Sequence, residues 1–291
     1  MSAELVDRGL LTYTVLLLLA TAVVQCVAPL TGVSSSAVQG VALLPWLAWV
    51  IAHSTLVRGG RLTAQLLMLA GAMAFGVEVA AVNFTDTFHH ALHPQIFGVP
   101  VQIVCAWIIY LYAGFAVTLA LGGPGHTRRG ALLFCGGAAL VTTALDLTAD
   151  PVGVQTGSFV YQQGGAFMRE IEGANGVHGI PLLNYVGWVL LAGGTYATFW
   201  LWTRHAEDGR DGGRLSALLF YVGLFVAAVI PAVRLGHPEL LLIGGLPVGL
   251  VALLVMQRLT ADRHARALGL RRGKERARVA SLAERRLASH R

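Results

Sequence analysis

The chain has 291 residues, of which 55% are hydrophobic and only 12% are charged, and its formal net charge is +6 at pH 7. Soluble domains typically contain about 25% charged residues, so this composition excludes an ordinary soluble domain and indicates an integral membrane protein. The three cysteines have no metal-binding spacing, and their odd number does not suit a disulfide framework, which favours structural roles inside helices.

Eight segments are long and apolar enough to cross a bilayer, which takes roughly 17–25 residues of helix. They lie near residues 10–30, 37–57, 63–84, 99–122, 130–149, 181–203, 214–234 and 238–257. The sequence therefore predicts an all-α fold, a polytopic bundle of about eight transmembrane helices. We expect one transmembrane domain over residues 1–257, with the site-bearing core at 63–203, and a basic tail over 258–291.

The distribution of basic residues gives an independent test of this topology. With eight spans, both termini and the second, fourth and sixth loops lie on one side, and that side holds 19 of the 21 lysines and arginines. Only Arg169 and Arg234 fall on the other side. Because lysine and arginine collect on the cytoplasmic side of membrane proteins, both termini are predicted to be cytoplasmic, in a plasma membrane.

The tail from Arg258 onward contains eleven of the basic residues. It is interpreted either as a solvated tail that fixes orientation or as a surface helix in contact with anionic membrane lipids. Nothing besides charge favours nucleic acid, so no nucleic-acid partner is expected.

Acidic side chains lie inside or next to the predicted spans, on the side opposite the termini. Glu78 lies about two turns inside the third span, Asp86 follows that span, and Asp146 and Asp150 end the fifth, four residues apart on one helix face. Carboxylates are costly in hydrocarbon and usually mark function there. Two on one face repel, so we expect at least one to be protonated near neutral pH and able to act as a general acid. For Asp150, which precedes a proline, a polar helix end is the alternative.

A short sequence recurs where two spans begin. Gly98-Val99-Pro100 is followed seven residues after the proline by Trp107, and Gly179-Ile180-Pro181 is followed at the same spacing by Trp188, an offset of 81 residues. Proline suits the first turn of a helix, where its missing N–H leaves no bond unmade. The repeat, with carboxylates upstream of each copy, predicts a parallel duplication of a helix pair whose two copies form the walls of one site.

Aromatic residues are expected close to these carboxylates. Trp107, Trp188 and Tyr185 fall one or two turns inside the fourth and sixth spans, and Tyr161 lies in the loop over 150–180. They are interpreted either as an interfacial aromatic belt or as π faces that stabilise a developing cation.

Three histidines, His89, His90 and His93, raise the question of a metal. His89 and His93 would share a face if this segment were helical, as metal-binding pairs do. The remaining histidines supply no second cluster, so we expect an interfacial loop and no metal.

The second block of motifs resembles a known family. Asp146-Leu-Thr-Ala-Asp150-Pro151, then Gly157-Ser-Phe159-Val-Tyr161, then Gly179-Ile-Pro181-Leu-Leu-Asn184-Tyr185-Val-Gly187-Trp188 is similar to the multi-pass carotenoid biosynthesis proteins that include the carotenoid hydratases. The first block, from Glu78 to Trp107, is similar in layout, and the resemblance covers about residues 70–205. The chain departs from the family pattern between Val79 and the histidines and in an acidic insert from Met168 to Val177.

The resemblance implies an enzyme that adds water across the terminal isopropylidene double bond of an acyclic carotenoid with forty or fifty carbons. Asp146 or Glu78 would donate the proton, Asp150 or Asp86 would orient and deprotonate the water, and Asn184 would hold the water or orient a carboxylate. The aromatic residues that would shelter the cation and bind substrate are Trp107, Tyr161, Tyr185 and Trp188. No cofactor is implied, and the expected partners are the carotenoid, membrane lipids and other membrane enzymes of the pathway.

Two other classes of function stay open at this stage. A proton-coupled transporter also uses membrane carboxylates, but transporters place them near the midplane and often contain inverted repeats, whereas here the acids lie toward one end and the repeat is parallel. A non-catalytic subunit of a lipid-pathway complex would need neither Glu78 nor Asp146.

Overall fold

The structure is a computed structural model that describes residues 3–27, 35–124, 127–204 and 213–288. In these ranges the chain forms eight helices. They are α1 (Ala3–Val27), α2 (Ser35–Arg58), α3 (Gly60–Asn83), α4 (Val101–Leu121), α5 (Arg128–Gln155), α6 (Leu182–Thr203), α7 (Arg214–Arg234) and α8 (Leu240–Ala288).

Six of the helices in the described ranges, α1, α3, α4, α5, α7 and α8, are long and apolar enough to cross a membrane. The other two, α2 and α6, occupy the remaining predicted spans and have 24 and 22 residues. The predicted all-α polytopic membrane bundle is confirmed. The chain divides into two compact units, Met1–Val251 and Ala252–Arg291, and the second is helical as far as Ala288.

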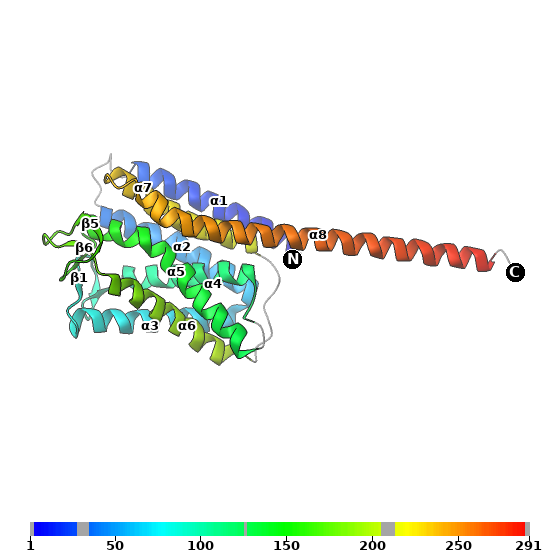
Figure 1. The fold of residues 1–291 in the computed structure, drawn as a ribbon, viewed down its shortest axis with the longest axis horizontal. Helices are drawn as coiled ribbons and strands as arrows, with labels where there is room; N and C mark the ends of the chain where they lie inside the picture. Colours follow the sequence, from blue (N-terminus) through cyan, green and yellow to red (C-terminus); the bar gives the residue numbers. More distant parts are fainter. Residues whose placement is uncertain (1–2, 28–34, 125–126, 205–212, 289–291) are drawn as a thin grey trace. The chain divides into compact units, whose positions relative to one another are not determined.

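In the first unit the helices pack around α4 and α5 (Figure 1). Helix α5 lies against α4, α6 and α7, helix α3 lies against α2, α4 and α6, and α1 lies against α2 and α7. The helices α4, α5 and α6 are joined by buried polar contacts: Tyr196 Oη donates to the Leu111 carbonyl at 2.7 Å and lies 2.6 Å from Thr142 Oγ1. Gly114 lets α4 approach α5, because a Cβ there would lie 1.9 Å from Thr142 Oγ1.

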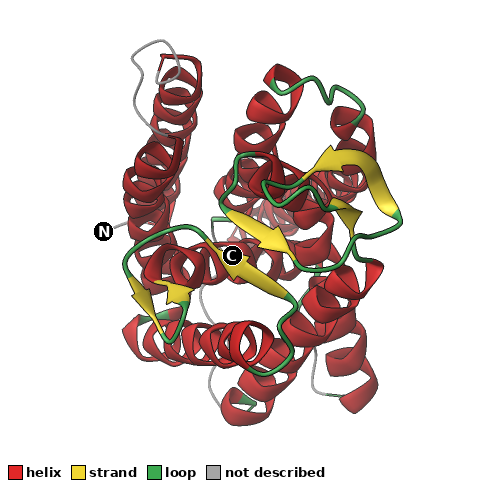
Figure 2. Ribbon diagram, turned by 90° about the vertical axis from the view of Figure 1, so that its left-hand side faces the viewer, coloured by secondary structure: helices red, strands yellow, loops and turns green. Residues whose placement is uncertain are grey.

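Six short strands cover one end of the bundle, here called the strand end (Figure 2). They are β1 (Phe88–His90), β2 (Gln95–Ile96), β3 (Val99–Pro100), β4 (Phe159–Tyr161), β5 (Phe167–Glu172) and β6 (His178–Ile180). They form three antiparallel pairs, β1 with β4, β2 with β3 and β5 with β6. The segments expected to be loops are therefore held in fixed register.

The hairpins that precede the two repeated helix starts have positive φ at corresponding turn positions. Phe97 and Gly98 have φ of 50° and 78°, and Met168 and Gly179 have φ of 50° and 75°. In the first copy these two residues join Ile96 directly to its partner Val99, whereas in the second copy twelve residues separate Phe167 from its partner Ile180. The ten-residue insert expected around 168–177 is thus an extension of the second hairpin. Pro100 and Pro181 cap the two helices and precede their first turn.

The pairing of β1 with β4 relates the two halves to each other. Phe88 lies opposite Tyr161, His89 opposite Val160, and His90 opposite Phe159. Aligning β1 with β4 in chain direction equates Phe88 with Phe159 and His90 with Tyr161. The two central residues of the antiparallel pair, His89 and Val160, are then equivalent to each other. The segments α3 to α4 and α5 to α6 therefore repeat one arrangement, each entering and leaving the strand end in the same order, as the predicted parallel duplication requires.

One local expectation was wrong. The Asp150-Pro151 pair does not end its helix, because α5 continues to Gln155 with Val152 and Val154 buried against β5 and β6. His89 lies in β1 and His93 in an irregular segment, so the two histidines do not share a helix face.

Candidate active site

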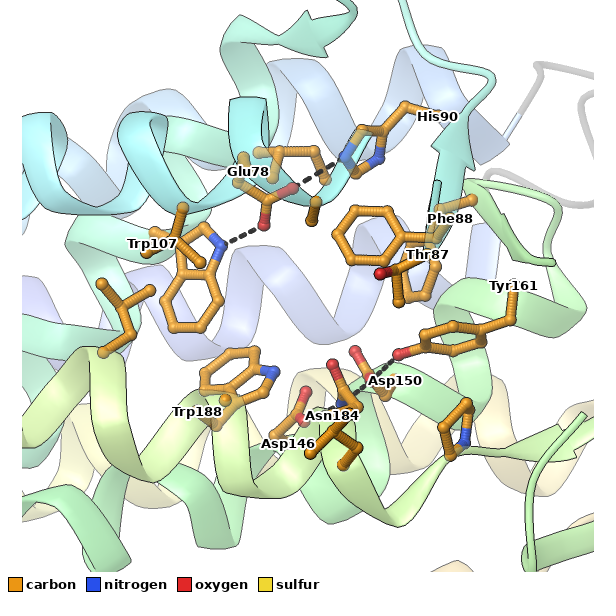
Figure 3. A pocket seen from close by; sticks show the side chains of 18 of the residues that line it. Glu78, Thr87, Phe88, His90, Trp107, Asp146, Asp150, Tyr161, Asn184 and Trp188 are labelled. Atoms are coloured by element: carbon orange, nitrogen blue, oxygen red, sulfur yellow. Dashed lines mark hydrogen bonds and ion pairs between the residues drawn. The ribbon is translucent and has the colours of Figure 1, made fainter. Parts of the chain in front are cut away.

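A cavity of about 440 Å³ lies at the strand end of the first unit, between α3, α4, α5 and α6 and under β1 and β4. Figure 3 shows two polar walls that face each other across it, one built by the first half of the repeat and one by the second. Both α3 and α5 run toward the strand end. The strand that follows each helix, β1 after α3 and β4 after α5, lies beside that helix and completes its wall.

The first wall is centred on Glu78 of α3, whose residue surface is only 6% exposed. Trp107 Nε1 of α4 donates to Glu78 Oε1 at 2.6 Å, and His90 Nε2 of β1 lies 2.9 Å from Oε2 (Figure 3). When Nε2 donates to the carboxylate, Nδ1 of a neutral imidazole is an acceptor. This Nδ1 is buried and has no hydrogen-bond partner among the described residues.

The second wall contains two carboxyl groups one helical turn apart on α5. Asp146 is 0% exposed and Asp150 is also buried. The Asn184 side-chain amide of α6 donates to Oδ2 of Asp146 at 3.2 Å and to Oδ2 of Asp150. Tyr161 Oη of β4 donates to the same Asp150 oxygen at 2.7 Å. Asp146 Oδ1 is buried and has no hydrogen-bond partner in the described part of the chain.

Tyr161 stays a neutral donor in this setting. Its burial and the neighbouring carboxylates of Asp150 and Asp146 raise the pKa of its phenol well above the ordinary value. The neutral phenol of Tyr161 therefore donates its hydrogen bond to Asp150. In the first wall the corresponding strand residue, His90, lies beside Glu78.

Two indoles close the inner part of the cavity. Trp107 and Trp188 are both buried and their ring centroids are 3.8 Å apart, with 32° between the planes. Tyr110 packs edge-on to Trp188 at 5.8 Å. An aromatic surface of this kind attracts a cation placed over its face.

Most residues singled out from the sequence line this one cavity: Glu78, Asp146, Asp150, Asn184, Trp107, Tyr161 and Trp188. Asp86 also borders it, but its side chain is 73% exposed and its Oδ1 lies 3.0 Å from His89 Nε2. Tyr185 is not among the lining residues; its ring packs edge-on to Phe167 at 5.2 Å, and its buried hydroxyl has no partner among the described residues.

Sequence reasoning missed His90 and Tyr110. His90 was grouped with His89 and His93, and only the pairing of β1 with a strand seventy residues later places it beside Glu78. The spacing from Tyr110 to Trp107, one helical turn, was the available signal for the tyrosine. In the described part of the chain, no group of three or more His, Cys, Asp or Glu side chains is arranged to hold a metal ion.

Comparison with known proteins identifies a family. The family model of carotenoid biosynthesis proteins matches residues 12–252 of the chain. No curated protein and no solved structure matches it. The family match covers α2 to α7 completely and α1 and α8 in part, and it includes every residue that lines the cavity. The chain therefore belongs to the carotenoid biosynthesis protein family.

Proposed function

We propose that this membrane protein of carotenoid biosynthesis is a hydratase, which adds water to the terminal isopropylidene double bond of an acyclic carotenoid. The observation that carries the proposal is the buried Asp146–Asp150–Asn184 cluster, which faces Glu78 and His90 across a cavity closed by two packed indoles. Hydration of such an alkene needs a proton donor, a shielded tertiary cation and a delivered water molecule, and the cavity offers a group for each.

Asp146 is assigned as the acid. Oδ1 is the oxygen that no described side chain occupies, and it is completely buried. In a site of low dielectric, beside a second carboxyl group, one of the pair keeps its proton near neutral pH. The O–H bond of Asp146 breaks, the proton goes to the CH carbon of the double bond, and the cation forms on the carbon that holds the two methyl groups.

The cation is sheltered by the neighbouring aromatic and acidic groups. The π faces of Trp107 and Trp188 stabilise positive charge, by about 0.5–2 kcal/mol for each favourable contact. The Glu78 carboxyl group, bonded by Trp107 and His90, lies on the opposite wall. Asp150, held by Asn184 and Tyr161, orients Asp146.

The water is assigned to the first wall. A lone pair of water attacks the cation, and its proton passes to Nδ1 of His90, whose other nitrogen is tied to Glu78. Return of that proton to Asp146 through solvent completes the cycle, so the net reaction is alkene plus water giving a tertiary alcohol. The reaction is redox-neutral and requires no redox cofactor. Asp86 is a weaker candidate for this role because it is exposed and paired with His89.

The test is pigment analysis in a host that makes acyclic carotenoids. Wild-type chain should produce carotenoid heavier by one water, about 18 Da, per modified end, and Asp146→Asn should abolish that product because an amide cannot donate the proton. Glu170→Gln is the matched control, since Glu170 is exposed on β5 and outside the cavity. Near-normal hydroxylated pigment from an inserted Asp146→Asn protein would sink the assignment of Asp146 as the acid.

We also propose a plasma-membrane location with both termini in the cytoplasm, supported by the 19 of 21 basic residues on that side of the predicted topology. The strand end and its cavity then lie in the outer half of the membrane. Membrane lipids, the carotenoid and other enzymes of the pathway are the proposed partners, and the basic tail over 258–291 is proposed to contact anionic lipid.

A further inference from the structure

We propose that the carotenoid enters the cavity sideways from the lipid, through an opening between α3 and α6. We call this opening the lateral portal; it is bordered by Val77 and Ala81 of α3 and by Leu183 and Gly187 of α6. The inference rests on the proposed function, because the occupant to which it commits is the polyene chain of the carotenoid.

The size of the cavity requires such an opening. The cavity has a volume of about 440 Å³ and is bounded by parts of four helices and two strands. A carotenoid of forty carbons, whose extended chain is comparable in length to the bilayer core of about 30 Å, is much longer than such a cavity. Only one end can therefore occupy the cavity, and the rest of the apolar chain must leave it along a path that avoids water.

The portal residues face both the cavity and the outside of the bundle. Leu183 is 75% exposed and Val77 is 44% exposed, yet both line the cavity. Their neighbours Leu182, Val186 and Leu190 are also exposed and apolar, as expected of a surface against lipid. Residues that line the cavity and are also exposed on the outer surface border an opening, and this opening faces the lipid.

The two helices separate toward the strand end. At the level of Gly194 they are in contact, because a Cβ on Gly194 would lie 3.7 Å from Met73 Cε. Gly187 lies two turns closer to the strand end and also lines the cavity, yet a Cβ there would meet no atom within 4 Å. The space beside Gly187 is therefore open.

The quasi-equivalent seam in the other half lies between α4 and α5, against which α7 packs. By the offset of the repeat, Gly187 corresponds to Ala106 of α4. When Glu78 is equated with Asp150, Val77 corresponds to Ala149 of α5. Helix α7 packs against both α4 and α5. The duplication creates two similar seams, and α7 covers one of them, which leaves the α3–α6 seam as the path to lipid.

The first test fills the portal. Gly187→Phe should abolish formation of hydrated carotenoid, because the added ring occupies open space that the polyene requires. Gly76→Phe is the matched control: Gly76 is exposed on α3 next to Val77, a Cβ there meets no atom within 4 Å, and it does not line the cavity. Both variants should insert normally, and the control should hydrate like wild type. Wild-type pigment from Gly187→Phe would overturn the portal.

The second test does not depend on hydration. A photoreactive phenylalanine analogue replaces Leu183 or, as a control at the same depth, the exposed Leu182, which does not line the cavity. In cells that accumulate acyclic carotenoid, illumination should attach intact carotenoid to position 183 and not to position 182, also in the Asp146→Asn background. Equal labelling at both positions, or no labelling at position 183, would overturn the portal. Selective labelling at position 183 by a wild-type chain that forms no hydrated carotenoid would overturn the proposed reaction alone.

Discussion

At the scale of single residues, the site depends on polar groups that are buried and only partly bonded. Buried polar atoms usually have a partner, so those without one call for an explanation. Among the described residues that line the cavity, Asp146 Oδ1 and His90 Nδ1 are such atoms, one on each wall. The proposed mechanism uses the first as the acid and the second as the acceptor for the proton of water.

The His90 assignment gives a prediction that separates it from its neighbour. His90→Gln preserves an N–H that can donate to Glu78 but removes the basic nitrogen, so the rate of hydration should fall by a factor of about 10²–10⁴, the usual contribution of a general base. His89→Gln should have little effect, because the side chain of His89 is half exposed and pairs with the exposed Asp86. The measurement is the initial rate of hydrated pigment formation in membranes with equal protein content. Equal rates for the two variants would remove His90 from the mechanism.

The acidic and aromatic members of the site could be predicted from the sequence because each stands out locally. A carboxylate in an apolar span, or a tryptophan at the same step after two Gly-x-Pro sequences, needs no knowledge of the fold. His90 could not be predicted in this way, because its role arises from pairing between strands about seventy residues apart. Tyr185 was selected for its place near the helix start, but its ring faces Phe167.

At the scale of helices and strands, the apolar runs predicted all eight helices, whereas their ends depended on tertiary contacts. Proline removes one intrahelical hydrogen bond, which suggested that α5 would end near Asp150. The helix continues because Val152 and Val154 bury their side chains against Met168, Ile171 and Ile180 of the second hairpin. The strands themselves were not predicted, since segments of two to six residues are specified by their partners and not by local periodicity.

The close approach of α4 and α5 gives a second prediction. Gly114→Leu should lower the stability of the folded bundle by about 1–3 kcal/mol or more, because the new side chain overlaps Thr142 and forces the helices apart. Gly136→Leu on α5 is the control, as a Cβ there meets no atom within 4 Å. Thermal unfolding in detergent measures both, and equal midpoints for the two variants would mean that the helices do not pack at Gly114.

At the scale of the whole molecule, the duplicated helix pairs place two similar polar walls around one cavity, and the two walls differ in the groups that they present. The first half supplies Glu78 with a histidine, and the second supplies an aspartate pair with an asparagine and a tyrosine. Such an asymmetric pair suits a reaction that needs an acid on one side of a double bond and a base on the other.

The proposed topology makes a prediction of its own. A fluorescent protein that matures only in the cytoplasm, fused after Arg291, should be fluorescent, and the same reporter inserted after Gly173 in the second hairpin should be dark. The reason is the segregation of basic residues, which indicates that the termini and the strand end lie on opposite sides. A reporter that shows the reverse pattern would invert the topology and place the cavity on the cytoplasmic side.

The central claim, that the cavity adds water to a carotenoid double bond, is tested most directly by the source of the oxygen in the product. Membranes containing the wild-type chain are incubated with an acyclic carotenoid in water enriched in oxygen-18, and the hydroxylated pigment is analysed by mass spectrometry. Hydration predicts that the new hydroxyl group contains the heavy isotope and that its formation continues without molecular oxygen. A product whose oxygen comes from molecular oxygen would contradict the account, as would the absence of any hydroxylated pigment.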